Sequence, residues 1–443
     1  MTDSYPRVLV VDGMPFSRMR NGGIVKSQLF AGWPKDRLRQ ITYSDIEVGF
    51  DVCERYWRLS KKGVLLGTIG RAPGRGQSEL TRAEGGPESS SVNSPVEQPY
   101  SWLSPQIRVP LSYWILGLPA VLSRPLSAWI DEFSPEIIFS FAASGFILRT
   151  VTQIAERWKL NAVPYFADDW ISTLYREYVL GSVLRRSIRR WFDRCLAVAP
   201  IRLTPNEAMA REYERRYGGR FQSMYYAEAV RPYSPPPSLP VVRFVFMGTL
   251  VPRRWSSLKQ IGQALDSLAE EGLKGELVIY SFPEELQPLM SQRLPRSVKL
   301  AGTASPGDVN RIQAGANVLV HAESLDAASR AYTRLSLSTK ISQYCMAGRC
   351  VLAIGPAEGA SIRYVSESGA GVAVTEDNPD AIRNTLRALI RDESMRRHYG
   401  EAAYQVAIER NDEVRQRRRF RESLCSAAGQ EPSILHSMCL DAR

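Results

Sequence analysis

Short runs of apolar residues alternate with longer stretches of helical periodicity along most of this chain. The first run, 7–12, is β-branched and stops at Gly13, and helix-like sequence resumes after residue 23. Further runs that predict strands lie at 137–141, 163–166, 244–247, 277–280, 318–320 and 351–354. Helical stretches such as 255–271 and 338–347 lie between most of them. Strands that alternate with helices predict an α/β protein with parallel sheets built from βαβ units.

Two breaks in this pattern divide the chain. Residues 67–99 are rich in Gly, Ser, Pro and Glu, which predicts a loose insert in the first domain. The stretch 234–240, Ser-Pro-Pro-Pro-Ser-Leu-Pro, is a stiff linker immediately before a new strand. We therefore expect an N-terminal Rossmann-like domain over 1–237, a C-terminal one over 238–405, and a helix with a tail over 406–443.

Composition narrows the class of protein without choosing its ligand. Of 443 residues 44% are hydrophobic, which excludes a wholly disordered chain. The 57 Lys and Arg exceed the 46 Asp and Glu by 11, so the surface suits an anionic membrane, a phosphate-bearing substrate or nucleic acid. Six cysteines without a C-x-x-C pair and three histidines do not form a zinc pattern, which favours thiols in a reducing cytoplasm.

The chain shows no sign of membrane insertion. The N-terminal residues lack a basic region followed by an apolar stretch, so no signal peptide is expected. The longest apolar stretch, around 111–122, contains Gly117 and Pro119 and is too short to span a bilayer. We expect a cytoplasmic protein, with peripheral attachment to the inner face of the membrane left open.

A glycine pair follows the first predicted strand. Gly22 and Gly23 open a helix, where backbone N–H groups can approach a ligand and the helix N-terminus favours an anion. Lys26 and Ser27 come next, as in a phosphate-binding P-loop, but Val25 occupies the required glycine position. A P-loop NTPase is therefore not supported, and an ordinary turn is the alternative to a ligand-binding loop.

Two acids and a tryptophan follow the strand predicted at 163–166. Asp168, Asp169 and Trp170 thus stand at the carboxyl end of a strand, where open α/β sheets bind ligands. The carboxylates suit sugar hydroxyls or a catalytic base, and the indole suits stacking on a sugar ring. The alternative is that Asp169 only caps the next helix.

An arginine-rich stretch runs from Leu184 to Leu196. At helical spacing its arginines form a basic face beside an apolar, aromatic face. The arginines are Arg185, Arg186, Arg189, Arg190 and Arg194. Such a helix can lie on an anionic membrane surface, and the alternative is a solvated helix packed on its own domain.

The second half of the chain carries polar residues at successive strand ends. The candidates are Gly248, Arg254, Glu323, Ser336, Ser338, Thr339, Lys340 and Gln343. Arg254 follows a buried strand that ends in glycine, where a guanidinium can clamp a diphosphate. The Ser336–Thr339 stretch precedes a helix whose N-terminus suits a phosphate, and Lys340 adds positive charge. Gln343 lies one turn further along that helix and can face the same ligand.

The stretch from Met247 to about Gly371 resembles the donor-binding half of retaining GT-B glycosyltransferases of the family 4 type. The specific likeness is to the bacterial surface-polysaccharide branch. It rests on His321, Glu323, Ser324, Asp326, Ser336, Ser338, Thr339, Lys340, Gly348, Gly355 and Pro356. The glycine pair Gly22 and Gly23 is similar to the first-domain loop of that family. The resemblance implies an α/β GT-B fold, with two Rossmann-like domains facing across a cleft.

The resemblance also implies a nucleoside diphosphate sugar as a substrate, no separate cofactor and no metal. No Asp-x-Asp motif, the usual metal–diphosphate clamp of the other main glycosyltransferase fold, occurs in the sequence. Several positions depart from the family pattern. Its two glutamates, eight positions apart, fall on Leu335 and Gln343, Thr249 stands where a first basic residue is usual, and Asp168 lies near a replaced histidine.

Together these features predict a metal-independent glycosyltransferase of the hexosyltransferase class, acting on a lipid-linked surface glycan. Arg254 and Lys340 would stabilise the leaving diphosphate, and Gly22 and Gly23 would join the donor contacts. Asp168 would act in catalysis, with the neighbouring Asp169 and Trp170 binding the acceptor. The alternatives are a non-catalytic nucleotide-sugar binding protein and a nucleotide-sugar epimerase. No nucleic-acid partner is expected.

Overall fold

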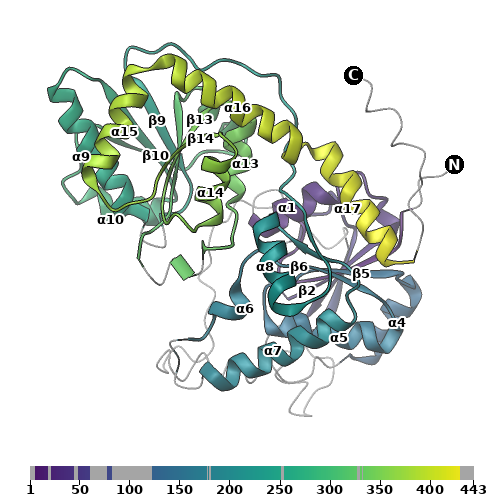
Figure 1. Cartoon of the computed structure of the whole chain (residues 1–443). Helices are drawn as coiled ribbons and strands as arrows, with labels where there is room; N and C mark the ends of the chain where they lie inside the picture. The colour runs from purple at the N-terminus through teal and green to yellow at the C-terminus, as the bar shows by residue number, and fades with distance from the viewer. Residues whose placement is uncertain are drawn as a thin grey trace. The chain divides into compact units, whose positions relative to one another are not determined.

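The computed structural model describes residues 5–17, 21–43, 48–59, 77–81, 122–176, 178, 181–250, 254–326, 330–331 and 333–429 (Figure 1). The chain forms two compact units. Unit 1 ends at Met224 and resumes at Arg417, and unit 2 runs from Tyr225 to Gln416. Among the helices of the described residues, none has both the length and the apolar composition that a membrane span requires.

The chain first passes from unit 1 to unit 2 after Met224, between β8 (Phe221–Ser223) and β9 (Val242–Met247). The boundary expected at 237/238 lies between the same two strands, further along the chain. The proline-rich linker belongs to unit 2 in this division because it is bonded there. Nη1 of Arg349 donates to the carbonyl of Ser234 at 2.7 Å, and Nδ2 of Asn317 donates to the carbonyl of Pro237 at 2.7 Å.

Unit 1 is built on an eight-stranded sheet in the order β4-β3-β2-β1-β5-β6-β7-β8. Its strands are β1 (Val8–Asp12), β2 (Leu38–Thr42), β3 (Arg55–Leu59), β4 (Gln77–Thr81), β5 (Ile137–Phe141), β6 (Ala162–Tyr165), β7 (Arg202–Thr204) and β8. All neighbouring pairs are parallel except β3 and β4. The strand order reverses between β1 and β5, and this arrangement confirms the predicted α/β class with a mainly parallel sheet.

Strand β4 corrects one expectation, because residues 77–81 lie inside the stretch expected to be a loose insert. The strand pairs antiparallel with β3, and the carboxylate of Glu79 accepts bonds from Nε of Arg55 and from Nε1 of Trp129 at 2.7 and 2.8 Å. The strand is mostly polar, so its sequence lacks the apolar run that predicts a buried strand. It is held instead by its backbone pairing with β3 and by these side-chain bonds. The rest of 67–99 lies outside the described residues.

The helical segments of unit 1 cover its sheet. They are α1 (Asn21–Leu29), a short 3-10 helix η1 (Lys35–Arg37), α4 (Arg124–Phe133), α5 (Gly145–Trp158), α6 (Trp170–Thr173), α7 (Gly181–Ala197), α8 (Glu207–Tyr217) and most of α17 (Glu413–Ala427). The last of these, drawn in yellow in Figure 1, returns to the first domain of the chain. Its Phe420 ring lies 4.9 Å from that of Phe30 and 5.1 Å from that of Phe139, so α17 completes the core of unit 1.

Unit 2 holds a six-stranded, fully parallel sheet in the order β11-β10-β9-β12-β13-β14. Its other strands are β10 (Gly275–Tyr280), β11 (Val298–Gly302), β12 (Val318–Ala322), β13 (Cys350–Ile354) and β14 (Gly371–Val374). Its helices are α9 (Arg254–Glu270), α10 (Pro283–Met290), α11 (Val309–Ala314), α13 (Thr339–Met346), α14 (Ala360–Glu367), α15 (Pro379–Arg391) and α16 (Glu393–Asn411). Every strand predicted here is confirmed, and the strand order reverses between β9 and β12.

A buried ion pair holds the end of β1 against α1 in unit 1. Nζ of Lys26 lies 2.8 Å from Oδ2 of Asp12, with the lysine side chain 0% and the aspartate side chain 4% exposed. The amine also donates to the carbonyl of Met14. The loop after β1 is fixed further by Gln40, whose amide donates to Met14 at 2.8 Å and accepts from the backbone of Phe16 at 3.2 Å.

Replacing Lys26 with Met should destabilise unit 1 strongly, because Asp12 would keep a buried charge without its partner. Breaking a buried pair in this way costs on the order of 3–5 kcal/mol. The matched change Lys35→Met removes a surface pair with Glu54 at 3.1 Å, and such pairs are worth about 1 kcal/mol or less. Denaturant unfolding measures both changes, and equal losses would show that the buried pair contributes no special stability.

Candidate functional site

The predicted donor-site residues gather at the switch point of the unit 2 sheet. Strands β9 and β12 are neighbours there, although they belong to opposite halves of the strand order. Gly248 directly follows β9, and Glu323 directly follows β12. Because ligands bind outside the carboxyl ends of the strands at such a point, the topology places these residues where an α/β sheet offers a site.

The closest contact at this point joins Gly248 and Lys340. Gly248 has φ +133°, a backbone conformation that favours glycine at the end of β9. A Cβ atom built on it would also overlap Nζ of Lys340, so the lysine would have to move. The lysine amine lies 5.6 Å from the centre of the Phe246 ring, so α13 presents its first lysine directly to the backbone at the strand end.

Arg254 begins α9 and bonds the residue that follows the same glycine. Its Nη1 donates to the carbonyl of Thr249 at 3.1 Å and to the Thr249 hydroxyl at 2.8 Å. Burial lowers the pKa of Arg254, while attraction by Glu323 and Glu285 opposes that shift. Thr249, which replaces the usual first basic residue, thus orients the guanidinium that remains.

Lys340 is held in an environment that disfavours its charge. Burial lowers its pKa to about 7, the positive charge of Arg254 adds to the shift, and Glu285 opposes it. A negative charge placed against the two side chains would favour the charged form of the amine.

Glu285 belongs to this site although no sequence pattern pointed to it. Its Oε2 accepts a bond from the backbone N–H of Leu250 at 2.9 Å and a short bond from the Ser281 hydroxyl. These bonds join the loop after β9 to the start of α10. The sequence does not predict this residue because Glu285, which follows β10, comes close to the site only when β10 pairs with β9.

A buried carboxylate lies on the β12 side of the site. Glu323 is 3% exposed, and its Oε1 lies 3.1 Å from Nε2 of His321. Burial lowers the pKa of His321, which favours the neutral ring near neutral pH. Although burial opposes the charge of Glu323, its hydrogen bond and attraction to His321 and its bonding to other side chains lower its pKa. An ionised carboxylate at this point can accept hydrogen bonds from sugar hydroxyls.

The N-terminus of α13 closes the site. Ser338 is the residue before the helix, and its backbone N–H donates to the hydroxyl of Ser361 at 3.1 Å. That hydroxyl donates in turn to the carbonyl of Ser336 at 3.3 Å, which fixes the approach to the helix. Thr339 then begins α13, and Gln343 follows one turn later with a partly exposed side chain.

In unit 1 the glycine pair lies at the start of α1. A Cβ atom on Gly23 would lie 2.8 Å from the carbonyl oxygen of Pro15, so this position requires glycine, whereas Gly22 faces open space. The amine of Lys26 is bound in the buried ion pair with Asp12. This agrees with the absence of a P-loop, while a donor contact by Gly22 and Gly23 stays a prediction.

The predicted acceptor residues are held by bonds within unit 1. The carboxylate of Asp169 accepts from the Tyr213 hydroxyl at 3.0 Å and pairs with Arg216 at 2.9 Å, and it makes no side-chain cap bond. Trp170 is 5% exposed, and its Nε1 donates to the carbonyl of Ala142 at 2.7 Å. An acceptor contact by either side chain would have to disturb these bonds. Asp168 is partly exposed in the same loop.

The arginine-rich stretch forms α7, but its apolar face is not available to a membrane. Leu184, Ile188 and Phe192 are buried inside unit 1. Arg194 pairs with Glu156 at 2.6 Å. Because that face packs into the domain core, the structure favours the alternative of a helix packed on its own domain, and the exposed side of α7 carries arginines together with Val183.

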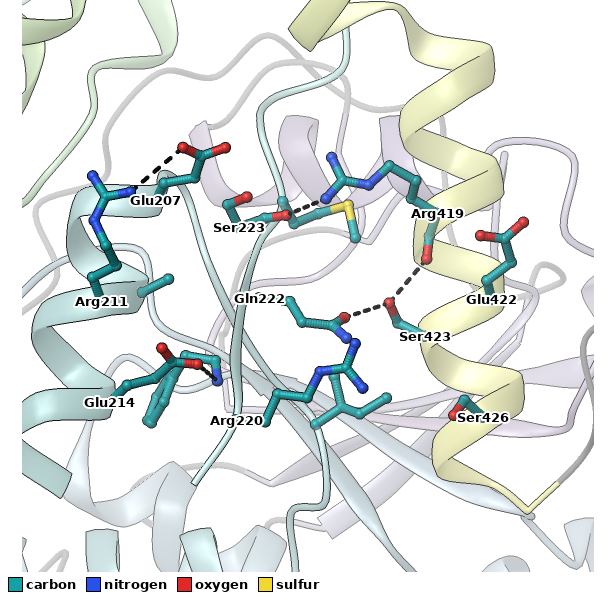
Figure 2. Close-up of a pocket in the computed structure, with 14 residues that line it drawn as sticks. Glu207, Arg211, Glu214, Arg220, Gln222, Ser223, Arg419, Glu422, Ser423 and Ser426 are labelled. Carbon is teal, nitrogen blue, oxygen red and sulfur yellow. Dashed lines mark hydrogen bonds and ion pairs between the residues drawn. The ribbon is translucent and has the colours of Figure 1, made fainter. Parts of the chain in front are cut away.

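A pocket of about 600 Å³ lies in unit 1, between α8, the edge strand β8 and α17 (Figure 2). Arg419 spans one wall and donates to the carbonyl of Ser223 at 3.0 Å. Arg211 and Arg220 lie near the acids Glu207 and Glu214 on the other side. None of the predicted site residues lines this pocket, and its charges offset one another.

Comparison with known proteins identifies the fold. No protein-family model and no curated protein matches the sequence. The HepE protein of Anabaena, solved in complex with UDP, matches with a TM-score of 0.62 and 13% identity, over 95% of this chain and 100% of its own. WaaG, a glycosyltransferase involved in lipopolysaccharide biosynthesis, gives 0.55 and 13% over 94% of this chain and 99% of its own.

A sucrose-phosphate synthase from Thermosynechococcus elongatus gives a TM-score of 0.59 at 13% identity, over 93% of this chain and 96% of its own. At such identities the likeness establishes the fold. The chain has the two-sheet architecture of retaining GT-B glycosyltransferases, which confirms the fold predicted from the resemblance.

The Lys340 amine should titrate with a midpoint near 7, its pKa in this structure. Arg254→Met should raise that midpoint because it removes a like charge, and Glu285→Gln should lower it because it removes an opposite charge. Lysine-selective NMR titration measures the shift, with the exposed Lys299 as an internal control. A midpoint near that of an ordinary lysine, about 10.4, would contradict the proposed burial of this amine.

Proposed function

We propose that this protein is a glycosyltransferase that moves a sugar from a nucleoside diphosphate donor onto an acceptor hydroxyl. The observation that carries the proposal is the pair Lys340 and Arg254 at the switch point of unit 2, where Lys340 lies beside Gly248, Arg254 bonds Thr249, and the two cations repel each other. Two neighbouring cations suit a diphosphate, the leaving group in such a reaction. HepE has been solved with UDP-glucose, so this donor is the first to test.

The chemistry expected of these residues is electrostatic. Negative charge grows on the diphosphate as the sugar leaves, and preorganised cations stabilise the transition state more than the ground state. Diphosphate binding would raise the lowered pKa of Lys340, so that the amine is charged during transfer. Glu323 would accept bonds from donor sugar hydroxyls, and Gln343 would bind the ribose. None of these steps uses a metal, and the sugar is proposed to be a hexose.

The proposed contacts of unit 1 involve the loop after β6 and the glycine pair. Asp168 is proposed to orient an acceptor hydroxyl, because it is partly exposed at the carboxyl end of β6. Gly22 and Gly23 are proposed to contact the donor. A lipid-linked surface glycan on the cytoplasmic face of the membrane is the acceptor class implied by the family resemblance.

A non-catalytic nucleotide-sugar binding protein is the second candidate, favoured by Leu335 and Thr249 at positions where the family has charged residues. It would bind UDP tightly and release no sugar from any donor. An epimerase would instead convert one nucleotide-sugar into another without an acceptor. Product analysis with a panel of UDP-, GDP- and ADP-sugars separates the three activities.

Lys340→Ala and Arg254→Ala should each lower donor turnover by about 100-fold or more, the loss typical when one preorganised group is removed from a transition state. Lys299→Ala is the matched control, because this surface lysine of unit 2 pairs with Glu276 at 2.6 Å, on β10 away from the site. Release of the nucleoside diphosphate from each donor of the panel is measured for all three variants. Wild-type rates in both site variants would contradict the proposed site.

Membrane attachment through α7 should depend mainly on its exposed arginines, because Leu184, Ile188 and Phe192 are buried. Replacing Arg186 and Arg190 together with Glu should weaken binding to anionic vesicles by about tenfold or more, since each basic residue near such a surface contributes about 1 kcal/mol. Arg293→Glu on unit 2 is the control. Co-sedimentation measures the effect, and wild-type protein that ignores anionic vesicles would remove this partner.

A further inference from the structure

The two segments that join unit 2 to unit 1 pair with each other through Glu228. Its backbone N–H donates to the carbonyl of Asn411 at 2.7 Å, and its carbonyl accepts from the N–H of Glu413 at 3.0 Å. These bonds form an isolated parallel bridge between Glu228 and Asp412. Asn411 is 1% exposed, and its amide donates to the carbonyl of Tyr226 at 2.8 Å. The backbone at Glu228 is therefore fixed next to both chain connections.

The side chain of Glu228 reaches α13, the helix that carries the proposed diphosphate site. Oγ of Ser342 lies 3.0 Å from Oε1 of Glu228 and 2.7 Å from the carbonyl oxygen of Thr339. A serine hydroxyl has one proton and can donate to only one of these two oxygens. Both contacts are hydrogen bonds at once only when Glu228 is protonated and donates to Ser342, which then donates to Thr339.

The charges around Glu228 are compatible with a carboxylic acid. Burial raises its pKa to about 7, the Ser342 bond and attraction by Arg231 oppose this rise, and Glu413 at the start of α17 adds to it. Burial also lowers the pKa of Arg231 on the same segment. From α13, Ser342 is the group that faces the carboxyl.

We propose that Glu228 is a positioning residue, which as a neutral acid fixes the first turn of α13 through Ser342 and Thr339. When Glu228 loses its proton, the Ser342 hydroxyl turns to the carboxylate and the Thr339 carbonyl loses that bond. The new negative charge then lies beside Ser342, which is three residues after Thr339 in α13. The inference rests on the proposed function, because it assigns the purpose of this turn to diphosphate binding.

UDP binding measured by calorimetry at about pH 6 and about pH 8, on either side of the Glu228 pKa of about 7, tests this role. Glu228→Gln cannot ionise, yet its amide can still donate to Ser342. We expect wild-type affinity to fall between the two pH values by about two- to fivefold more than that of Glu228→Gln, the effect of one charge near a helix end. The titration of Lys340 is common to both proteins and cancels.

Ser342 provides the second arm of the test. Ser342→Ala, introduced into wild type and into Glu228→Gln, should reduce the difference between their pH profiles, because it removes the hydroxyl link to Thr339 and leaves only the effect of the Glu228 charge. Ser342→Thr keeps the hydroxyl and should restore that difference. Glu270→Gln, an exposed carboxylate of α9, should behave as wild type. Equal pH profiles in wild type and Glu228→Gln would overturn the proposal.

Thermal unfolding detects the protonation state of Glu228 without any bound nucleotide or nucleotide-sugar. Its raised pKa means that the folded protein holds a proton which the unfolded chain loses above about 4.3. The Tm of wild type relative to Glu228→Gln should therefore fall as the pH rises towards 7, and parallel Tm profiles would overturn the proposal. Wild-type protein that binds no UDP at either pH counts instead against the proposed function, whereas normal UDP binding with equal pH profiles overturns the Glu228 role alone.

Discussion

The close approach of Lys340 to the backbone of Gly248 determines the arrangement of the site in unit 2. The φ of +133° at position 248 favours glycine after β9, and the missing side chain leaves room for the amine. One helical turn later, the hydroxyl of Tyr344 accepts from the N–H of Met247 at 3.2 Å and lies 3.4 Å from its carbonyl. These contacts fix α13 against the end of β9, and the polar residues of the helix N-terminus take their places from that docking.

The two units use similar polar sequence in different ways. In unit 1, Lys26 and Asp169 both form ion pairs within the domain, and Trp170 is a core residue. In unit 2, Arg254 and Lys340 lie together at a strand end, where burial lowers the pKa of both. The cost of keeping two cations there is a reason to expect an anionic ligand in unit 2, and the pairs of unit 1 give no such reason.

Periodicity was enough to predict the parallel sheets, because buried strands of an α/β fold read as short apolar runs. It also brought Gly248, Arg254 and Lys340 to one site, since each follows a strand or opens a helix. What it missed depends on contacts between distant segments. Strand β4 is held by pairing with β3, Glu285 reaches Leu250, and Glu228 reaches Ser342 across 114 residues of chain. Such contacts leave no periodic signal in the sequence.

The departures from the family pattern weigh less against catalysis once their positions in the fold are known. Leu335, at the position of the first family glutamate, is 5% exposed and belongs to the core of unit 2. A carboxylate is nevertheless present at the switch point, because Glu323 follows β12 and is held by His321. Thr249, which replaces a basic residue, bonds the guanidinium of Arg254. The chain therefore has a carboxylate and two cations at this switch point, which are charges that suit the proposed transfer from a nucleoside diphosphate sugar.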